Sequence, residues 1–421
     1  MIGGGQLARM THQAAIALGQ SLRVLAVAAD DSAALITPDV EIGAHTDLEA
    51  LRRFATGCDV VTFDHEHVPT EFIAALVDDG HLVYPSAEAL QYAQDKGLMR
   101  RRLAALGLPV PAFDVVEPGV ATNVVLAAVT GFGDRHGWPV VLKTCRGGYD
   151  GRGVWMLTDR AEAADTIDGL ADAGPLLVEQ KVPLRRELAA VVARSPFGQA
   201  AAWPVVETVQ QDGICVEVIA PAPKLIGSRA VAAEELALRI AATLGVVGVL
   251  AVELFEVEPS TLYPDGLIIN ELAMRPHNSA HWTQDGAVTS QFEQHLRAVL
   301  DYPLGQTSAV HPVTVMANVI GAAGPLVPGA TAPGLPASGM DERVHHLAAR
   351  FPQAKVHLYG KSFRPGRKLG HVNVGGSELP AVRRVAQLAA HYLSSGVWAD
   401  GYVLPPHEGI PHGTPRDTVS V

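Results

Sequence analysis

A lysine and a glycine-rich turn stand between two apolar runs in Val140 to Trp155, VVLKTCRGGYDGRGVW. An apolar run ends at Lys143, a turn with four glycines follows, and a second apolar run extends from Gly153 to Leu157. This pattern predicts a strand, a glycine-rich turn and a second strand. Glycine exposes its backbone N–H and accepts positive φ, which suits a loop around an anion. We interpret the segment as a hairpin over nucleotide phosphates supported by Lys143, with an ordinary glycine hairpin as the alternative.

Two further apolar runs contain acidic residues. Glu253 lies within VLAVELF, and Asn270 and Glu271 lie within LIINELAM. An unpaired carboxylate buried in such a strand is strongly disfavoured, so it needs a cation. Oxygen ligands without cysteine or paired histidine favour a hard ion, Mg²⁺ or Mn²⁺. The alternative is that both carboxylates point out of a half-solvated sheet.

Polar and basic segments follow these strands. Arg275 to Ser279, RPHNS, comes directly after the second acidic strand and is interpreted as a substrate loop, with a plain surface loop as the alternative. Lys361 to Lys368, KSFRPGRK, holds four cations in eight residues of a chain whose net charge is −12. Such a cluster predicts a phosphate clamp, with a solvated basic turn as the alternative.

The first 110 residues alternate strand and helix patterns, which predicts parallel βαβ units with ligands beyond the carboxyl ends of the strands. GGGQLARM (3–10) and DHEH (64–67) lie at such ends. A dinucleotide-binding dehydrogenase would need G-x-G-x-x-G, and the third glycine is absent, so that reading is disfavoured. Only two residues precede the triplet, so either the strand before it is short or the true start lies upstream.

The hydrophobic pattern predicts the elements that position these residues. The expected helices are 6–18, 69–77, 86–106, 122–136, 160–171, 293–300 and 378–393, and the expected strands are 22–29, 58–63, 81–84, 175–182, 186–193, 246–257, 266–274, 354–358 and 369–374. In the helix expected at 86–106, the run Arg100-Arg101-Arg102 is expected to be mostly solvated. Leu108 to Pro111 is interpreted as a linker, giving expected domains at 1–110, 111–320 and 321–400 and a tail at 401–421.

Composition narrows the class of protein. The chain has 421 residues, of which 48% are hydrophobic and 18% charged, so it is globular and large enough for two or three domains. Its net charge of −12 argues against nucleic-acid binding. No apolar run is long enough to span a bilayer and the N-terminus lacks a signal-peptide pattern. Three widely spaced cysteines fit reduced thiols in the cytoplasm better than disulfides.

Taken together, these segments resemble the ATP-grasp superfamily and, within it, the 5-(carboxyamino)imidazole ribonucleotide synthetases of purine biosynthesis. The resemblance extends from Gly3 to about Val397 and rests on six motifs in the family's order: GGGQLARM, DHEHVP, RGGYDGRGVW, VEQKV, INELAMRPHNSAHWT and YGKSFRPGRKLGHVN. It implies an N-terminal parallel α/β domain, a central ATP-grasp domain with a mobile lid, and a small C-terminal β-rich domain, an α/β and α+β fold. The implied reaction is ATP-dependent carboxylation of 5-aminoimidazole ribonucleotide by bicarbonate, which releases ADP and phosphate.

The resemblance also implies roles for individual residues. ATP would be bound by Lys143, the lid residues Gly148, Tyr149, Asp150, Gly151, Arg152 and Gly153, the adenine-binding segment Glu179, Gln180, Lys181 and Val182, the ribose-binding Glu187, and Asn270 with Glu271. Mg²⁺ would be bound by Glu253 and Glu271. Bicarbonate and the incoming amine would be positioned by Arg275, His277 and Lys361, with Tyr149 and Asp150 closing over them. The ribonucleotide would contact Gln6, Leu7, Glu66 and Asn278, and its phosphate would contact Arg367 and Lys368.

At Lys96 the sequence departs from the family, because Tyr92 stands where an arginine is usual four residues earlier, and Lys96 is therefore given no role. The family implies a homodimer. Two alternatives stay open: the formate-using glycinamide ribonucleotide transformylase of the same superfamily, and a catalytically inactive nucleotide-binding protein. The motif PHNSAHWT favours the carboxylating enzyme over the first, and intact Lys143, Glu253, Glu271 and Arg275 argue against the second.

Overall fold

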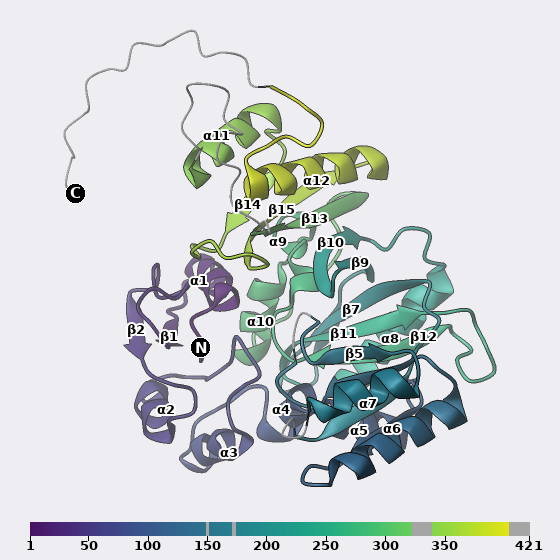
Figure 1. Cartoon of the computed structure of the whole chain (residues 1–421). Coiled ribbons are helices and arrows are strands. Elements are labelled where there is room, and N and C mark those ends of the chain that lie inside the picture. The colour runs from purple at the N-terminus through teal and green to yellow at the C-terminus, as the bar shows by residue number, and fades with distance from the viewer. Residues whose placement is uncertain (149–150, 171–173, 322–338, 404–421) are drawn as a thin grey trace, which may run out of the picture.

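The computed structural model describes residues 1–148, 151–170, 174–321 and 339–403. Figure 1 shows three groups of elements around a common centre: the N-terminal elements on the left, two sheets with their helices on the right, and the C-terminal helices at the top. In the described part of the chain, no helix is both long and apolar enough to cross a membrane.

The N-terminal group is a small parallel α/β unit. Its elements are α1 (Gln6–Ala17), β1 (Arg23–Ala26), β2 (Asp39–Ile42), α2 (Leu48–Ala55), α3 (Thr70–Asp78) and α4 (Ala87–Gln94). Strands β1 and β2 pair in parallel, and Ile2 bridges both Leu25 and Phe63 in parallel. The strands expected at 58–63 and 81–84 were wrong in extent, since in them only single residues bridge, such as Val61 with Val83. The unit therefore has the expected parallel order with little continuous pairing.

The helix expected at 86–106 was also wrong, because it is two helices, α4 and α5 (Lys96–Ala105). They meet at Asp95, whose backbone is extended and whose side chain caps α5 by accepting the N–H of Leu98. Asp95 also forms an ion pair with Arg146, 2.8 Å from Nε to Oδ2. The break points α5 toward the glycine-rich hairpin.

A four-stranded antiparallel sheet carries that hairpin. Its strands are β3 (Phe113–Val116), β6 (Leu176–Gln180), β4 (Val140–Thr144) and β5 (Val154–Leu157), in that spatial order. Helices α6 (Thr122–His136) and α7 (Arg160–Asp168) pack on it around a core that includes Phe132, Leu142 and Val178. Lys143 pairs with Val154 across the hairpin, so the expected strand, turn and strand are confirmed.

A nine-stranded sheet forms the opposite wall. Its spatial order is β12-β11-β7-β9-β10-β13-β15-β14, and β8 adds to β7. Their bounds are β7 (Arg186–Arg194), β8 (Ala200–Ala202), β9 (Val206–Gln211), β10 (Ile214–Ala220), β11 (Gly248–Glu256), β12 (Leu267–Ala273), β13 (Val313–Ile320), β14 (Lys355–Leu358) and β15 (Lys368–Gly376). The helices around it are α8 (Gly227–Thr243), a short 3₁₀ turn η1 (Asn278–Ala280), α9 (Thr283–Gly286), α10 (Gln291–Val299), α11 (Met340–Arg350) and α12 (Leu379–Ser395).

This large sheet continues across the domain boundary expected at residue 320. Strand β13 pairs with β10 on one side and with β15 on the other, so the C-terminal strands extend the central sheet. Helix α12 covers β13 and β15 around a core that includes Val315, Val372 and Leu393. The joint expected from Gly321 and the tail expected from Pro405 fall largely outside the described residues, and the domain limits stay a prediction.

Candidate active site

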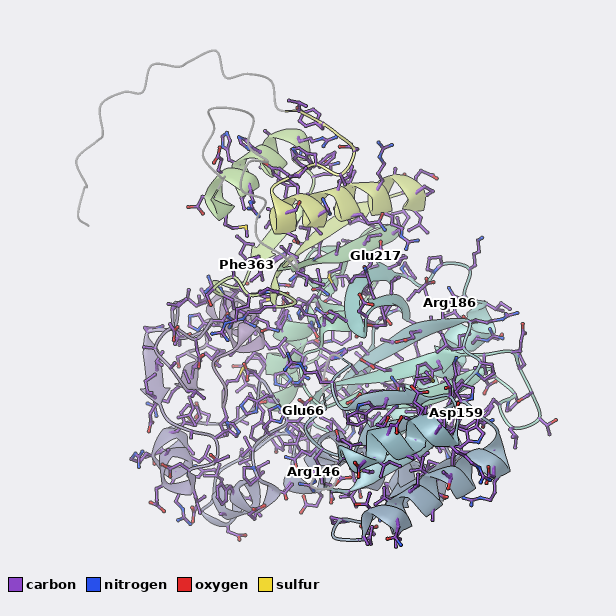
Figure 2. The ribbon with its side chains drawn as sticks, in the orientation of Figure 1. Glu66, Arg146, Asp159, Arg186, Glu217 and Phe363 are labelled. Carbon is purple, nitrogen blue, oxygen red and sulfur yellow. The ribbon has the colours of Figure 1, made fainter. Side chains whose placement is uncertain are left out.

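A cleft of about 1080 Å³ lies where the N-terminal group faces the two sheets. Figure 2 shows Glu66 at this meeting point near the centre of the molecule. The cleft brings together most of the residues expected from the sequence: Gln6, Leu7, Glu66, Lys143, Gly148, Gly151, Glu179, Gln180, Lys181, Val182, Glu187, Glu253, Asn270, Glu271, Arg275, His277, Asn278 and Lys368. Arg152, Gly153, Lys361 and Arg367 are described but do not line it. Tyr149 and Asp150 lie outside the described residues.

Lys143 is held at one end of the cleft by a buried ionic group. Its Nζ lies 2.6 Å from Glu179 Oε2 and 3.3 Å from Asn270 Oδ1. The other oxygen of Glu179 pairs with Arg100, whose guanidinium also donates to the Asn270 carbonyl at 2.6 Å. Burial alone would raise the pKa of Glu179, but the charges of Arg100 and Lys143 outweigh it and lower the pKa to about 2. The carboxylate thus stays ionised and anchors Lys143.

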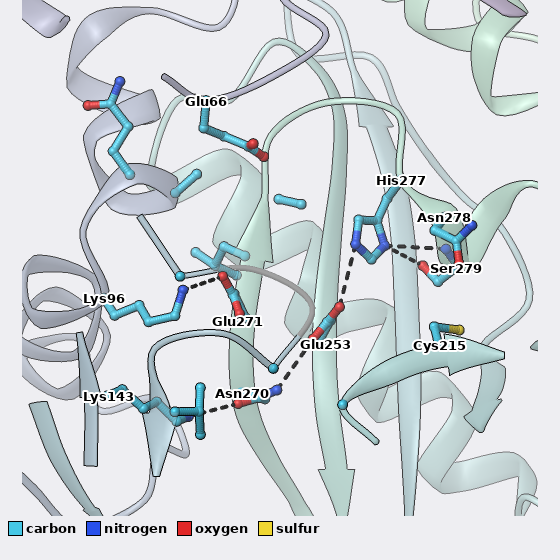
Figure 3. A pocket seen from close by; sticks show the side chains of 18 of the residues that line it. Glu66, Lys96, Lys143, Cys215, Glu253, Asn270, Glu271, His277, Asn278 and Ser279 are labelled. Atoms are coloured by element: carbon cyan, nitrogen blue, oxygen red, sulfur yellow. Dashed lines mark hydrogen bonds and ion pairs between the residues drawn. The ribbon is translucent and has the colours of Figure 1, made fainter. Parts of the chain in front are cut away.

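The two acidic strands meet in register at the floor of the cleft. Glu253 on β11 pairs with Glu271 on β12, and the register then slips so that Leu254 pairs with Ile269. Asn270 is the extra residue of this β-bulge, and bulges re-aim side chains next to active sites. Asn270 and Glu271 are consecutive and both reach the cleft, where Asn270 donates to Glu253 Oε2 at 3.3 Å (Figure 3).

The surroundings of Glu253 disfavour its ionised form. Burial, and then the charges of Glu271 and Glu187, raise the pKa of Glu253 to about 7. Glu187 lies beside it on β7, and burial also raises the pKa of that carboxyl. Lys96 partly offsets the negative charge, since its Nζ lies 2.6 Å from Glu271 Oε1 (Figure 3).

The two carboxylates fit a hard divalent cation whose other ligands include phosphate oxygens. Within the described ranges, no group of three or more His, Cys, Asp or Glu side chains could hold a metal by itself. Mg²⁺, however, is commonly bound by one or two carboxylates together with substrate phosphates. Glu253 and Glu271, with no further protein carboxylate needed, match that pattern.

At the N-terminal side, Arg275 forms an ion pair with Glu66, 2.7 Å from Nε to Oε1. Asp64 lies buried beside them and accepts the N–H of Gly5 at 2.6 Å. Gly3 has φ of +105°, and a Cβ there would lie 1.7 Å from Asp64 Oδ1. The glycine triplet therefore allows the start of α1 to approach the acidic loop that follows Phe63.

His277 reaches the carboxylates on the floor of the cleft. Its Nε2 lies 3.4 Å from Glu253 Oε1, and its Nδ1 lies 2.8 Å from Ser279 Oγ (Figure 3). Burial and then the charge of Arg275 lower its pKa to about 3, so the imidazole is neutral at physiological pH. Asn278 also lines the cleft, and its side-chain amide pairs with that of Asn318.

The cationic side chains of the basic turn, Lys361 to Lys368, lie in two different parts of the site. Lys361 Nζ donates to Gln6 Oε1 at the start of α1, and burial, then the charge of Arg367, lower its pKa to about 8. Arg367 donates to Ser362 Oγ at 2.9 Å. Lys368 instead lines the cleft on the side of Cys215 and His277, because β15 has a bulge at its first residues. Lys361 is thus nearer the start of α1 than the floor of the cleft.

In the described part of the glycine-rich loop, Gly151 approaches the turn between β9 and β10. Gly151 has φ of +76°, and a Cβ there would lie 3.2 Å from Gly213 Cα. Gly147 and Gly148 line the cleft beside Arg146. Described residues of both the loop and this turn therefore line the same cleft as Lys143.

Comparisons with known proteins bear on this geometry. Residues 1–94 match the ribonucleotide synthetase preATP-grasp domain, residues 101–292 the ATP-grasp domain, and residues 314–385 the phosphoribosylaminoimidazole carboxylase C-terminal domain. An N5-carboxyaminoimidazole ribonucleotide synthase of Mycobacterium leprae is 60% identical over 100% of this chain and 93% of its own. The chain belongs to the N5-carboxyaminoimidazole ribonucleotide synthase family.

Solved structures of this synthase family have the same fold. That of Thermus thermophilus gives a TM-score of 0.79 at 34% identity, covering 95% of this chain and 99% of its own. That of Aspergillus clavatus, in complex with ADP and 5-aminoimidazole ribonucleotide, gives 0.78 at 29% identity, covering 93% and 98%. The expected ATP-grasp fold with its N-terminal and C-terminal domains is confirmed.

In this member of the synthase family, sequence reasoning missed two charged residues of the site. Lys96 was given no role, yet it pairs with Glu271 inside the cleft. The run Arg100-Arg101-Arg102 was expected to be mostly solvated, and Arg101 and Arg102 are indeed exposed, but the Arg100 side chain is fully buried against Glu179. The one available signal was their spacing, since positions 96 and 100 lie on the same face of a helix.

Proposed function

We propose that the chain carboxylates the amine of 5-aminoimidazole ribonucleotide with ATP and bicarbonate, in de novo purine biosynthesis. The observation that carries the proposal is the cleft itself, in which the paired carboxylates Glu253 and Glu271 lie beside Arg275 and His277. The ADP and ribonucleotide complex of the Aspergillus clavatus synthase supports the same two ligands for this chain.

The nucleotide end of the cleft is suited to γ-phosphate transfer. An oxygen of bicarbonate attacks the γ-phosphorus, the bond to the β-phosphate breaks, and ADP and carboxyphosphate form. Such transfers need positioning and charge neutralisation more than covalent help from the protein. Lys143, anchored by Glu179, and the N–H groups of the glycine loop supply positive potential for the phosphates.

Glu253 and Glu271 would hold Mg²⁺ together with the phosphate oxygens. The ion, when bound, would neutralise the charge that develops between the β- and γ-phosphates. Lys96 would keep the second carboxylate oriented toward the cleft, since its ammonium lies 2.6 Å from Glu271 Oε1.

The second half-reaction joins carbon to nitrogen. The ribonucleotide amine attacks the carboxyphosphate carbon, the bond from that carbon to the bridging oxygen breaks, inorganic phosphate leaves with that oxygen, and the amine gives up one proton to the departing phosphate. Carboxyphosphate reacts readily with water, so a loop that closes the cleft has a purpose. His277 and Arg275 would hold the carboxyl oxygens, with Glu66 keeping the Arg275 guanidinium in place.

The ribonucleotide would lie at the N-terminal side, against Gln6, Leu7 and Glu66. The start of α1 is a favourable place for a phosphate, because its N–H groups and dipole point outward there. Lys361 contacts Gln6 at this point, so we propose that it shares the phosphate with Arg367, whereas Lys368 serves the carboxyl side.

We also propose that the active form is a cytoplasmic homodimer, as the family resemblance implies. Sedimentation of the purified chain tests the oligomeric state: a dimer is expected, and a monomer at assay concentrations would refute this part.

The proposed reaction is tested by ADP release with each acceptor pair. We expect release that depends on both 5-aminoimidazole ribonucleotide and bicarbonate, with no release above background for glycinamide ribonucleotide and formate. The reverse preference would favour the transformylase alternative. Tight ATP binding without release in either case would favour an inactive nucleotide-binding protein.

A further inference from the structure

A fully buried glutamine lies behind the loop that presents His277. The Oε1 of Gln291 accepts the His277 N–H at 2.7 Å, and its Nε2 donates to the His277 carbonyl at 2.8 Å. The second hydrogen of the same Nε2 points at His281 Nδ1, also at 2.8 Å. Flipping the amide would set its oxygen against the His277 carbonyl, so its orientation is fixed. Gln291 thus hydrogen-bonds to both the N–H and the carbonyl of His277.

The imidazole of His277 is held by a second residue, Ser279. The main-chain N–H of Ser279 points at His277 Nδ1 at 3.4 Å, and the Ser279 hydroxyl lies 2.8 Å from the same nitrogen. A main-chain N–H can only donate, so Nδ1 must accept. The ring proton then belongs on Nε2, which faces Glu253 Oε1 at 3.4 Å. The carboxylate form of Glu253 favours the same tautomer as the Ser279 N–H.

We infer that Ser279 and Gln291 are positioning residues that lock His277 as an Nε2–H donor aimed into the cleft. This inference rests on the proposed function for what the donor meets, namely a carboxyl oxygen of bicarbonate or carboxyphosphate. In the other tautomer, the Nε2 lone pair would face those oxygens and Glu253 alike, and both contacts would become repulsive. Fixed donors aimed at developing negative charge are a large part of catalysis in water-excluded sites.

Gln291 also determines the tautomer of His281. Its Nδ1 must accept from Gln291, so its proton also lies on Nε2, and that nitrogen is buried without a hydrogen-bond partner within the described residues. The ring also lines the cleft and packs 4.9 Å from His371, centroid to centroid. One buried glutamine therefore sets the backbone of one cleft histidine and the tautomer of another.

The direct test is ¹⁵N NMR of the full chain labelled at histidine, with the His277 signals assigned by their loss in His277→Gln. We expect Nε2 of wild type to be protonated and Nδ1 to be unprotonated. In Ser279→Ala the main-chain N–H is kept, so the Nε2–H form should stay the main one, but the ¹⁵N signal of Nδ1 should move because its 2.8 Å hydroxyl contact is lost; Ser279→Thr, which keeps a hydroxyl, should restore the wild-type signal. A wild-type ring protonated at Nδ1, or a Ser279→Ala spectrum identical to wild type, would overturn the inference. This readout needs no turnover, so it is independent of the proposed function.

Kinetics supply the second readout. Ser279→Ala should lower kcat about 10- to 100-fold, the range typical for residues that orient a functional ligand, with the KM for ATP unchanged. Ser195→Ala is the matched control, because Ser195 is equally buried and its hydroxyl has no hydrogen-bond partner in the described chain; its kcat should stay at the wild-type value. Equal kcat losses in both variants would indicate a merely structural role and would contradict the inference.

Gln291→Glu tests the backbone contact, since a carboxylate can accept from the His277 N–H but cannot donate to the carbonyl or to His281. Gln294 provides a close control on the same helix: it is equally buried, and its side-chain amide pairs in the same way with the N–H and carbonyl of Gly305. Gln291→Glu should lower kcat at least tenfold relative to Gln294→Glu, in line with the loss of one positioning contact. If the two variants have the same kcat, Gln291 does not position His277. If Gln291→Glu fails to fold, the NMR of wild type and Ser279→Ala still decides.

Discussion

Replacing Glu179 by glutamine should destabilise the protein and weaken ATP binding. The substitution keeps the shape of the side chain but removes the charge that Arg100 and Lys143 share. Folding lowers the pKa of Glu179 from 4.5 to about 2, and at 1.36 kcal/mol per pKa unit this corresponds to about 3 kcal/mol. Breaking a buried ion pair from one side costs about 3–5 kcal/mol, which agrees.

Urea denaturation at pH 7, followed by circular dichroism and fluorescence together, measures this loss, because coincident transitions are needed for a free energy of unfolding to be defined. Glu117→Gln is the control: Glu117 pairs with Arg101, next to Arg100, but both side chains are at least half exposed, so the loss should stay below about 1 kcal/mol. The contribution of Glu179 is present above pH 4.5 and is lost as the pH falls toward 2. The difference between wild type and variant should therefore shrink in acid. Equal losses of unfolding free energy in Glu179→Gln and Glu117→Gln at pH 7 would show that the buried ion pairs of Glu179 do not stabilise the protein.

Four further results are expected. Glu271→Gln should lower turnover by at least about a hundredfold, as when one preorganised charge is lost, with little recovery at high Mg²⁺; near-normal turnover would contradict the proposal that Glu271 binds the metal. Amide hydrogen exchange of the described residues in 146–153 should slow when an ATP analogue and Mg²⁺ bind, and unchanged rates would leave only a plain hairpin. Burial and Arg367 lower the pKa of Lys361 to about 8, so kcat/KM for the ribonucleotide should fall as the pH rises through 8, and in Lys361→Arg the fall should move to higher pH. A profile identical to wild type in that variant would show that another group titrates. Arg367→Ala should raise the KM for the ribonucleotide about 10- to 150-fold, the loss of one charge-assisted contact, with kcat little changed; an unchanged KM would make the turn a solvated surface.

Sequence patterns predicted the strands and helices that carry the site better than the contacts within it. Apolar runs such as that of β11 or α6 are local features, and their bounds follow from residues close in the chain. The bulge at Asn270 depends on how β12 pairs with β11, and no local pattern records a slip of register.

The same limit applies to charges. Arg100 has the sequence context of a solvated helix face, and only the break at Asp95, which turns α5 toward β6, buries it against Glu179. Lys361 and Lys368 lie seven residues apart in one basic turn, yet the start of β15 sends them to different parts of the site. Such placements follow from tertiary packing, which one sequence does not specify locally.

In the proposed reaction, bicarbonate is activated by phosphorylation within the cleft, and its carbon is then transferred to the ribonucleotide amine. The most direct measurement uses bicarbonate labelled with ¹⁸O, followed by mass analysis of the inorganic phosphate. Because the carbon–oxygen bond of carboxyphosphate breaks when the amine attacks, each phosphate should carry one oxygen from bicarbonate. Phosphate without label, formed at the same rate as the carboxylated product, would show that bicarbonate is not phosphorylated before the transfer.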